Sequence, residues 1–186
     1  MNYHKIEKTS VANGPGVRVT LWTSGCRVGC YNCQNPQTWR FDSGELFDDI
    51  AKEELFEALD KPYIKGITFS GGHPLEPENV ETIYFLIKEI KEKFSTKDIW
   101  LYTGYTLDIL NFTTVRKGIS FKCEYDNCMH YNLIHEILQL CDVVVDGPFI
   151  ESEKDLTLRW CGSRNQRVID CQETIKKGKI ILYKEQ

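Results

Sequence analysis

The sequence predicts an α/β fold built around a mainly parallel sheet. Short apolar runs typical of buried strands alternate with longer segments whose apolar residues recur every three or four positions. Strands joined by helices make right-handed crossovers, which place neighbouring strands parallel. A chain of 186 residues has the length of one domain and buries a substantial core. We therefore expect a single domain over residues 1–186.

The first expected elements lie within the first 70 residues. Residues 17–22, VRVTLW, predict a strand that runs into a cysteine-containing loop. A helix is expected from about Asp48, and residues 66–69 predict a second strand. The apolar face of that helix would consist of Ala51, Leu55, Ala58 and Leu59.

The alternation continues through the second half of the chain. A helix is expected from near Glu78, followed by a strand at 98–102, a helix at 133–140 and a strand at 143–145. The apolar face of the first of these helices would consist of Val80, Ile83, Ile87, Ile90 and Phe94. The last residues, 172–186, predict a turn and a short basic strand, which is more often a solvated edge than a binding surface.

Two motifs follow expected strands directly. Cys26, Cys30 and Cys33, spaced C-x3-C-x2-C, follow the first strand, and the pair Gly71 and Gly72 follows the second. Ligand sites in parallel sheets gather at the carboxyl ends of the strands. We therefore expect both motifs to meet on one side of the molecule.

The three cysteines indicate a metal centre. A [4Fe-4S] cluster usually takes four thiolates, so three would leave one iron open to another ligand. A zinc site with its fourth ligand elsewhere, or unliganded thiols, are alternatives at this spacing. Without an export signal, the eight cysteines read better as ligands or buried thiols than as disulfides.

The glycine pair adds to this evidence. Glycine lets the backbone approach a ligand closely and present its own carbonyl and amide groups, and Pro74 starts the next segment at a fixed φ. A Gly-Gly pair near a proline is by itself usually only a turn. Its combination with the cysteines favours a cofactor site.

Together these motifs resemble the radical S-adenosylmethionine superfamily, and within it the activating proteins of anaerobic ribonucleotide reductase. Several further stretches resemble that subgroup in order and spacing. They are residues 13–16 (Asn-Gly-Pro-Gly) with Arg18, Thr38 with Trp39, and residues 99–105, 145–148 and 162–167.

The resemblance implies a fold and a function. The fold would be an incomplete (β/α)6-type partial TIM barrel, because the chain is well short of the ~250 residues of a closed barrel. Its open side would admit a protein substrate. In the family, S-adenosylmethionine binds the open iron of a [4Fe-4S] cluster and is cleaved reductively, and the resulting radical takes a hydrogen atom from one glycine of a partner protein.

The resemblance also implies partners. The chain would be an oxidoreductase that generates a glycyl radical on the large subunit of anaerobic (class III) ribonucleoside-triphosphate reductase. By analogy, reduced flavodoxin or a similar protein would donate the electron.

Site residues carry over position by position. The three cysteines would hold the cluster, the backbone of Gly71 and Gly72 would contact the methionine moiety, and Asn32 and Gln34, which flank Cys33, would contact the nucleoside. No catalytic side chain is expected beyond the cluster and S-adenosylmethionine.

Two positions depart from the family pattern. His73 stands where an acidic residue usually precedes the proline, and no aromatic residue lies beside Cys33. We interpret His73 as a solvent-exposed loop residue without a catalytic role. The alternative is a histidine that tunes the charge or the pH response of the site.

Residues 112–132 resemble the family least and predict an insertion. Cys123, Cys128 and His130 would form an accessory zinc or redox site there, or else the insertion holds partly buried thiols. No fourth ligand is fixed in the sequence, although His135, Cys161 and Cys171 are available.

The remaining polar motifs have two interpretations. Asp146-Gly147-Pro148 and residues 162–167 are short polar turns after apolar strands. They would either shape the substrate mouth or simply end the strands.

Composition excludes several classes of function. The net charge is -4 without a long basic block, which argues against nucleic-acid binding. No apolar run approaches about 18 residues and the polar start is no secretory signal, so we expect a cytoplasmic protein without membrane contact.

Three alternative functions stay open at this stage. The chain would instead activate another glycyl radical enzyme, such as pyruvate formate-lyase. It would be an iron-sulfur electron carrier if a fourth cysteine completed the cluster. It would be a structural module if the cysteines held zinc.

Overall fold

A computed structural model of the chain describes residues 1–113 and 125–184. These residues form a seven-stranded sheet in the order β3-β1-β2-β4-β5-β6-β7. The strands are β1 (Asn2–Ser10), β2 (Arg18–Thr23), β3 (Glu45–Leu46), β4 (Gly66–Gly71), β5 (Asp98–Tyr102), β6 (Val143–Asp146) and β7 (Arg167–Asp170). The central strands β2, β4, β5 and β6 run parallel, whereas β1, β3 and β7 are antiparallel to their neighbours. The predicted α/β class is confirmed.

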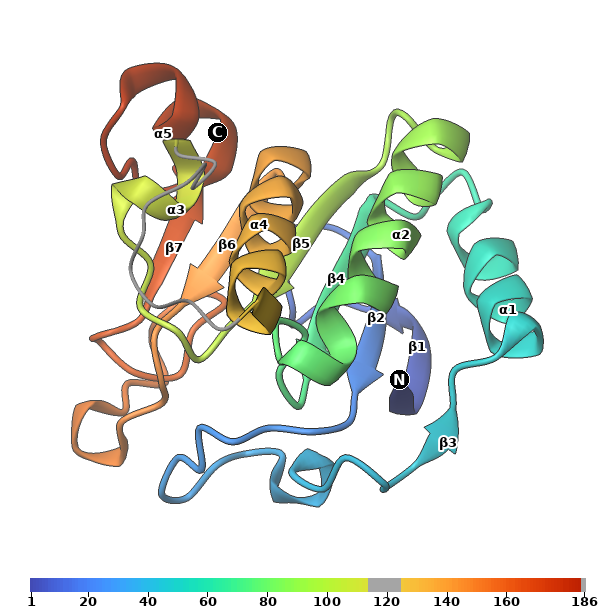
Figure 1. Cartoon of the computed structure of the whole chain (residues 1–186), viewed down its shortest axis with the longest axis horizontal. Coiled ribbons are helices and arrows are strands. Elements are labelled where there is room, and N and C mark those ends of the chain that lie inside the picture. The colour runs from blue at the N-terminus through green and yellow to red at the C-terminus, as the bar shows by residue number, and fades with distance from the viewer. Residues whose placement is uncertain (114–124, 185–186) are drawn as a thin grey trace.

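Helices cover one face of this sheet. They are α1 (Asp49–Leu59), α2 (Pro77–Lys93), α3 (Ile109–Thr113), α4 (Tyr125–Leu140) and α5 (Cys171–Lys177). The helices α2 and α4 lie side by side in front of the strands, and α1 lies beside them at the edge formed by β1 (Figure 1). Short 3₁₀ turns occur at Pro36–Thr38 and Glu151–Glu153. Among the described helices, none combines the length and the apolar character that crossing a membrane requires.

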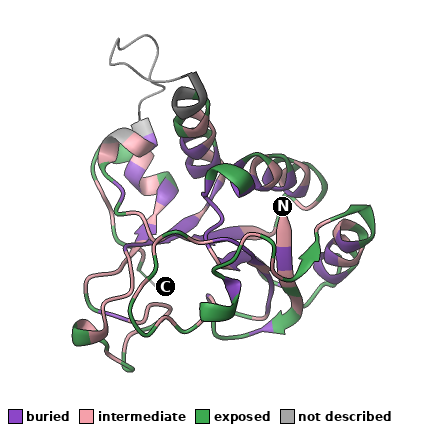
Figure 2. Ribbon diagram, turned by 60° about the horizontal axis from the view of Figure 1, so that its bottom comes forward, coloured by how far each residue is buried: buried purple, intermediate pink, exposed green. Residues whose placement is uncertain are grey.

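The main core lies between the sheet and these helices. Figure 2 shows buried residues along the sheet and on the helix faces turned toward it. Successive side chains of a strand point to opposite faces, so alternate residues enter this core. The strands supply Val19, Leu21, Ile67, Phe69, Ile99, Leu101 and Val144, and the helices supply Leu55, Leu59, Ile83, Ile87 and Ile137 among others.

On the opposite face, Arg18 forms a buried polar clamp. Its guanidinium donates to Thr68 Oγ1 at 2.9 Å, lies 2.5 Å from Asp98 Oδ1 and stacks over the Trp100 ring. The side chain has no exposed surface. A Cβ on Gly14 would lie 2.9 Å from the Arg18 side chain, so the turn at 13–16 closes over it. The clamp gives this motif a structural role.

The C-terminal prediction was correct in part, because the chain turns at Gly178 and residues 181–183 pair with β7, but it missed helix α5. Residues 171–177 form α5, which ends at Gly178 in a left-handed conformation suited to glycine. Residues 180–183 make only an isolated bridge, between Leu182 and Ile169, although Tyr183 also donates its backbone N–H to Val168. This segment therefore pairs with the outer edge of β7 without becoming a regular strand.

Other differences concern elements with mixed polarity. Strands β1 and β7 were not expected, because polar residues interrupt their apolar alternation. Helix α4 begins at Tyr125, ahead of the expected start at 133. The predicted insertion at 112–132 therefore overlaps the ends of α3 and α4, and its middle, residues 114–124, lies outside the described residues.

We predict that Arg18→Ala lowers the free energy of unfolding by about 3 kcal/mol, because it removes the cation beside Asp98 Oδ1, an oxygen that is shielded from solvent and has no hydrogen-bond partner. Urea denaturation of the apo-protein measures this change. Arg40→Ala is the control, because Arg40 pairs with Asp42 on the exposed surface and its removal should leave the midpoint unchanged. Equal midpoints for the two variants would contradict the prediction.

Candidate functional site

The carboxyl ends of the parallel strands surround a cavity of about 180 Å³. Its walls are the loops that follow β2, β4, β5 and β6. The loops after β2 and β6 extend beyond the sheet at the bottom of Figure 1. Residues lining the cavity include Cys26, Cys30, Cys33, Gln34, Gly71, Gly72, Thr103, Phe149, Gly162 and Gln166. Both expected motifs therefore reach one side of the molecule, as parallel strand order requires.

Cysteine is the only one of the common metal-binding residue types Cys, His, Asp and Glu among the described residues that line the cavity. Among the described lining residues there is no histidine, aspartate, glutamate, lysine or arginine. All three thiols are half-buried, and burial raises the pKa of Cys26 and of Cys30. The Cys33 sulfur accepts a hydrogen bond from the Asn35 backbone N–H at 3.3 Å. Burial therefore disfavours the thiolate forms of Cys26 and Cys30, and a bound cation such as iron would stabilise them.

The cysteine loop, residues 24–40, is held by its own backbone. The N–H groups of Gly25 and Cys26 donate to the carbonyls of Thr38 and Trp39 at 2.8 and 3.0 Å. A Cβ on Gly25 would lie only 2.2 Å from the Phe41 ring. The Thr38-Trp39 motif therefore closes this loop.

The glycine pair brings the end of β4 against the cysteine loop. The N–H groups of Gly72 and His73 donate to the carbonyls of Thr23 and Gly25, each at 2.8 Å. A Cβ on Gly71 would lie 2.8 Å from the Thr23 nitrogen, and one on Gly72 would lie 2.7 Å from the Gly25 oxygen. Close approach of two backbones thus requires glycine here, while both residues still line the cavity.

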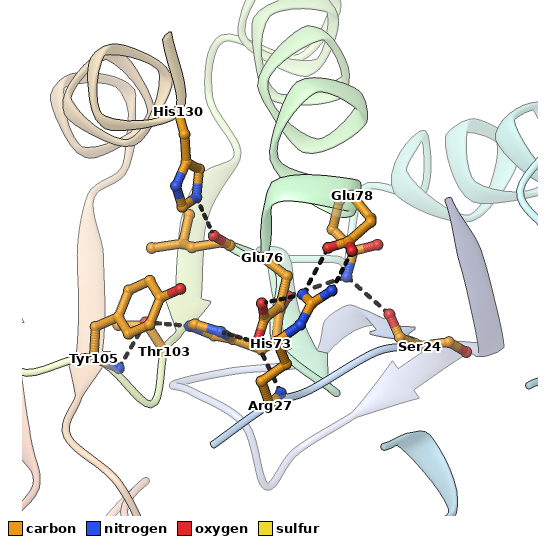
Figure 3. Close-up of polar contacts among 10 residues, drawn as sticks. Ser24, Arg27, His73, Glu76, Glu78, Thr103, Tyr105 and His130 are labelled. Carbon is orange, nitrogen blue, oxygen red and sulfur yellow. Dashed lines mark hydrogen bonds and ion pairs between the residues drawn. The ribbon is translucent and has the colours of Figure 1, made fainter. Parts of the chain in front are cut away.

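His73 is buried, so its interpretation as an exposed residue was wrong. Only 1% of His73 is accessible. Its Nδ1 lies 3.2 Å from Glu76 Oε1, its Nε2 lies 2.7 Å from Thr103 Oγ1, and its ring meets the Tyr105 ring edge to face (Figure 3). Partners for both ring nitrogens remove the cost of burying the imidazole.

Glu76, at the N-terminus of α2, binds the cysteine loop. It accepts the Arg27 backbone N–H and the Arg27 guanidinium, each at 2.8 Å, while the guanidinium also pairs with Glu78 (Figure 3). Burial is the largest single influence on the pKa of Glu76 and raises it. The hydrogen bonds from His73 and Arg27 together outweigh burial, so the pKa falls from 4.5 to about 2.

The last wall consists of the turns that follow β6, some of whose residues line the cavity while others hold the strand ends. Gln166 accepts the Gly162 N–H at 2.8 Å and donates to the Gly147 carbonyl at 3.0 Å, which joins the two turns. Asp146 is fully buried and pairs with Arg167. Gly147, Gly162 and Gln166 line the cavity, whereas Asp146 and Arg167 hold the strand ends behind it.

The residues expected to contact the nucleoside lie in different places. Gln34 is on the cavity wall, 3.4 Å from where a Cβ on Gly162 would be. Asn32 is exposed, has a φ of 54° and lies outside the lining. Glu76 and Arg27 were not anticipated. The spacing of Glu76 three positions after His73, at the start of a helix, was the available signal.

The described part of the predicted accessory site is engaged elsewhere. His130 Nε2 donates to the Leu75 carbonyl at 2.7 Å, and His135 Nδ1 donates to the Asn111 carbonyl at 3.1 Å. Cys123 and the Cys128 side chain lie outside the described residues. Within the described residues, no three His, Cys, Asp or Glu side chains are close enough together to hold one metal ion. This finding includes Cys26, Cys30 and Cys33, which in a four-iron cluster would each bind a different iron.

We predict that the stabilising effect of Glu76 disappears in acid. The folded protein keeps Glu76 ionised to about pH 2, whereas the unfolded chain protonates it near its usual pKa of 4.5. Its contribution is therefore complete above about pH 5 and is lost as the pH falls toward 2. Urea unfolding of the apo-protein should show that Glu76→Gln is less stable by about 2 kcal/mol at pH 7, with this gap closing in acid. A gap that is constant with pH would contradict the assignment.

A second prediction concerns Gly71, which has a φ of 98°. Gly71→Ala adds a backbone clash to the strain of a positive φ, so we expect a loss of about 3 kcal/mol in unfolding free energy. Gly178→Ala is the matched control, because Gly178 also has a positive φ, of 62°, but its added Cβ meets nothing within 4 Å. That variant should lose about 1 kcal/mol. Equal losses would show that the close approach is unimportant.

Comparison with known proteins agrees with this geometry. Residues 12–169 match the model of the 4Fe-4S single cluster domain. Proteins named anaerobic ribonucleoside-triphosphate reductase-activating protein are similar over most of the chain. The one from Escherichia coli is 38% identical over 170 residues, which is 90% of this chain and 97% of the relative. The one from Haemophilus influenzae is 38% identical over 168 residues, or 89% of this chain and 96% of the relative.

A viral relative extends the comparison. The protein of the same name from Enterobacteria phage T4 is also 38% identical over 170 residues, or 90% of this chain and 93% of its own length. The chain therefore belongs to the family of anaerobic ribonucleoside-triphosphate reductase-activating proteins, with a 4Fe-4S single cluster domain.

Proposed function

We propose that this chain reductively cleaves S-adenosylmethionine at a [4Fe-4S] cluster and generates a glycyl radical on anaerobic ribonucleoside-triphosphate reductase. The observation that carries the proposal is the composition of the cavity. Three cysteines are its only thiols, and the described lining holds no histidine, aspartate or glutamate. Three thiolates leave one iron of a four-iron cluster open for a small molecule.

The residues present fit such a cluster. Cys26, Cys30 and Cys33 belong to one loop and face one cavity, and Val28 and Phe149 give its wall an apolar component. An apolar, partly buried surrounding limits the access of water and oxygen to the metal centre. When bound, the cluster and S-adenosylmethionine would supply the one-electron chemistry.

Residues of the chain itself would bind and orient S-adenosylmethionine. Backbone groups of Gly71 and Gly72 would hold the methionine moiety, because the turn brings them to the cavity without side chains in the way. Gln34 would contact the nucleoside from the cavity wall. Asn32 would reach it only from its exposed position beside Cys33.

The architecture supports entry of a protein substrate. We infer a single radical S-adenosylmethionine domain whose sheet is an incomplete barrel, with the described helices on one face. Its described parallel strands number four, rather than the six of the expected (β/α)6 type, because β1, β3 and β7 are antiparallel to their neighbours. A glycine-containing segment of the reductase large subunit would enter between the loops after β2 and β6. Reduced flavodoxin or a similar donor would reduce the cluster.

The first test measures cleavage of S-adenosylmethionine. After anaerobic reconstitution with iron and sulfide and chemical reduction, we predict 5′-deoxyadenosine formation that falls at least 100-fold in Cys26→Ala, Cys30→Ala and Cys33→Ala. Cys161→Ala is the matched control, because Cys161 is also half-buried but lies outside the cavity lining. Absence of cleavage by a fully loaded wild-type cluster would instead indicate an electron carrier.

The second test identifies the partner. Electron paramagnetic resonance should detect a glycyl radical when the reduced protein and S-adenosylmethionine are mixed with the anaerobic reductase large subunit. Pyruvate formate-lyase should give no radical under the same conditions. A radical on pyruvate formate-lyase alone would reject the reductase as the partner.

A further inference from the structure

We infer that His73 and Glu76 form a positioning pair that fixes three walls of the cavity relative to one another. The walls are the cysteine loop, the glycine turn and the end of β5. The inference rests on the proposed function, since it concerns how the cluster loop and the S-adenosylmethionine cavity are held. Neither side chain lines the cavity, so both act through other residues.

Glu76 secures the cysteine loop. Its Oε1 accepts the N–H of Arg27, the residue that directly follows Cys26, and its Oε2 accepts the Arg27 guanidinium. The glutamate is only 2% accessible, so water competes little for these bonds. A backbone bond at this position fixes the direction in which the chain leaves Cys26.

His73 connects this carboxylate to the cavity wall. A carboxylate only accepts hydrogen bonds, so Nδ1 donates to Glu76 and Nε2 faces the Thr103 hydroxyl. Thr103 lines the cavity, and its Oγ1 also accepts the Tyr105 N–H at 3.1 Å. These two contacts fix the position of Thr103 Oγ1 on the cavity wall, where it would meet a bound ligand.

Glu78 offers a natural control for this arrangement. It shares the Arg27 guanidinium with Glu76, but its side chain is 47% accessible, against 3% for Glu76, and no described hydrogen bond joins it to His73. Glu78→Gln therefore perturbs the same arginine from outside while leaving the chain from Arg27 through Glu76 and His73 to Thr103 complete.

Two substitutions of His73 test the two hydrogen bonds of its imidazole separately. The amide nitrogen of an asparagine side chain lies near the position of the His73 Nδ1. The variant His73→Asn therefore keeps a donor for Glu76 and loses the contact with Thr103. The longer glutamine side chain places its amide near the position of Nε2. The variant His73→Gln therefore keeps the contact with Thr103 and loses the contact with Glu76. Thr103→Val removes the hydroxyl with little change in shape, which keeps the test independent of any folding defect at His73.

The experiment uses the reconstituted holoprotein and two binding measurements. For Glu76→Gln and His73→Gln, we expect a chelator to remove iron about 10-fold faster, with a changed spectrum of the reduced cluster. For His73→Asn and Thr103→Val, we expect unchanged iron retention and about 10-fold weaker binding of S-adenosylmethionine. The double variant His73→Asn with Thr103→Val should bind no more weakly than Thr103→Val alone, because Thr103→Val already breaks the contact with His73.

The opposite results would overturn the inference. Iron retention and S-adenosylmethionine affinity in all four single variants equal to those of Glu78→Gln would show that the pair positions nothing. Equal loss of both properties in His73→Asn and His73→Gln would indicate general destabilisation instead. A wild-type protein that binds no cluster or no S-adenosylmethionine would instead reject the proposed function, so the two failures are distinguishable.

Discussion

The close approach of two backbones at the end of the sheet is the constraint on which the site depends. The turn at Gly71 and Gly72 lies against the carbonyls that begin the cysteine loop, at distances that leave no room for a Cβ. The cysteines and the glycine turn share one cavity because of this contact. The buried chain of hydrogen bonds through Glu76 and His73 then extends the same alignment to the end of β5.

The two faces of the sheet are stabilised by different interactions. Apolar packing against α1, α2 and α4 stabilises one face, whereas the other face uses the buried Arg18 clamp and an aromatic group of Trp100, Trp160 and Tyr183. Motifs that resemble functional signatures therefore separate into two kinds. Arg18 and Asp146 serve the scaffold, while the cysteines, the glycine pair and Gln166 reach the cavity.

Sequence patterns predicted the elements in which one physical signal dominates. The regular apolar spacing of α2 and the apolar run of β5 gave nearly correct bounds. Strand β1 and helix α5 were missed because their many polar residues leave no regular apolar spacing in the sequence. Tertiary contacts determine these elements instead. His73 was misjudged for a similar reason, since the burial of an imidazole depends on partners such as Thr103 that are distant in the sequence.

The edges of the sheet limit how another protein can approach. On one side, the two-residue strand β3 pairs only with Asn2 and Tyr3, so the outer edge of β1 over residues 4–10 pairs with no other described strand. On the other side, the outer backbone of β7 is already paired with the segment around Leu182. An occupied edge discourages a foreign strand from joining the sheet, whereas an uncovered edge offers it free backbone groups. A partner that adds a strand to this sheet would therefore join β1 rather than β7.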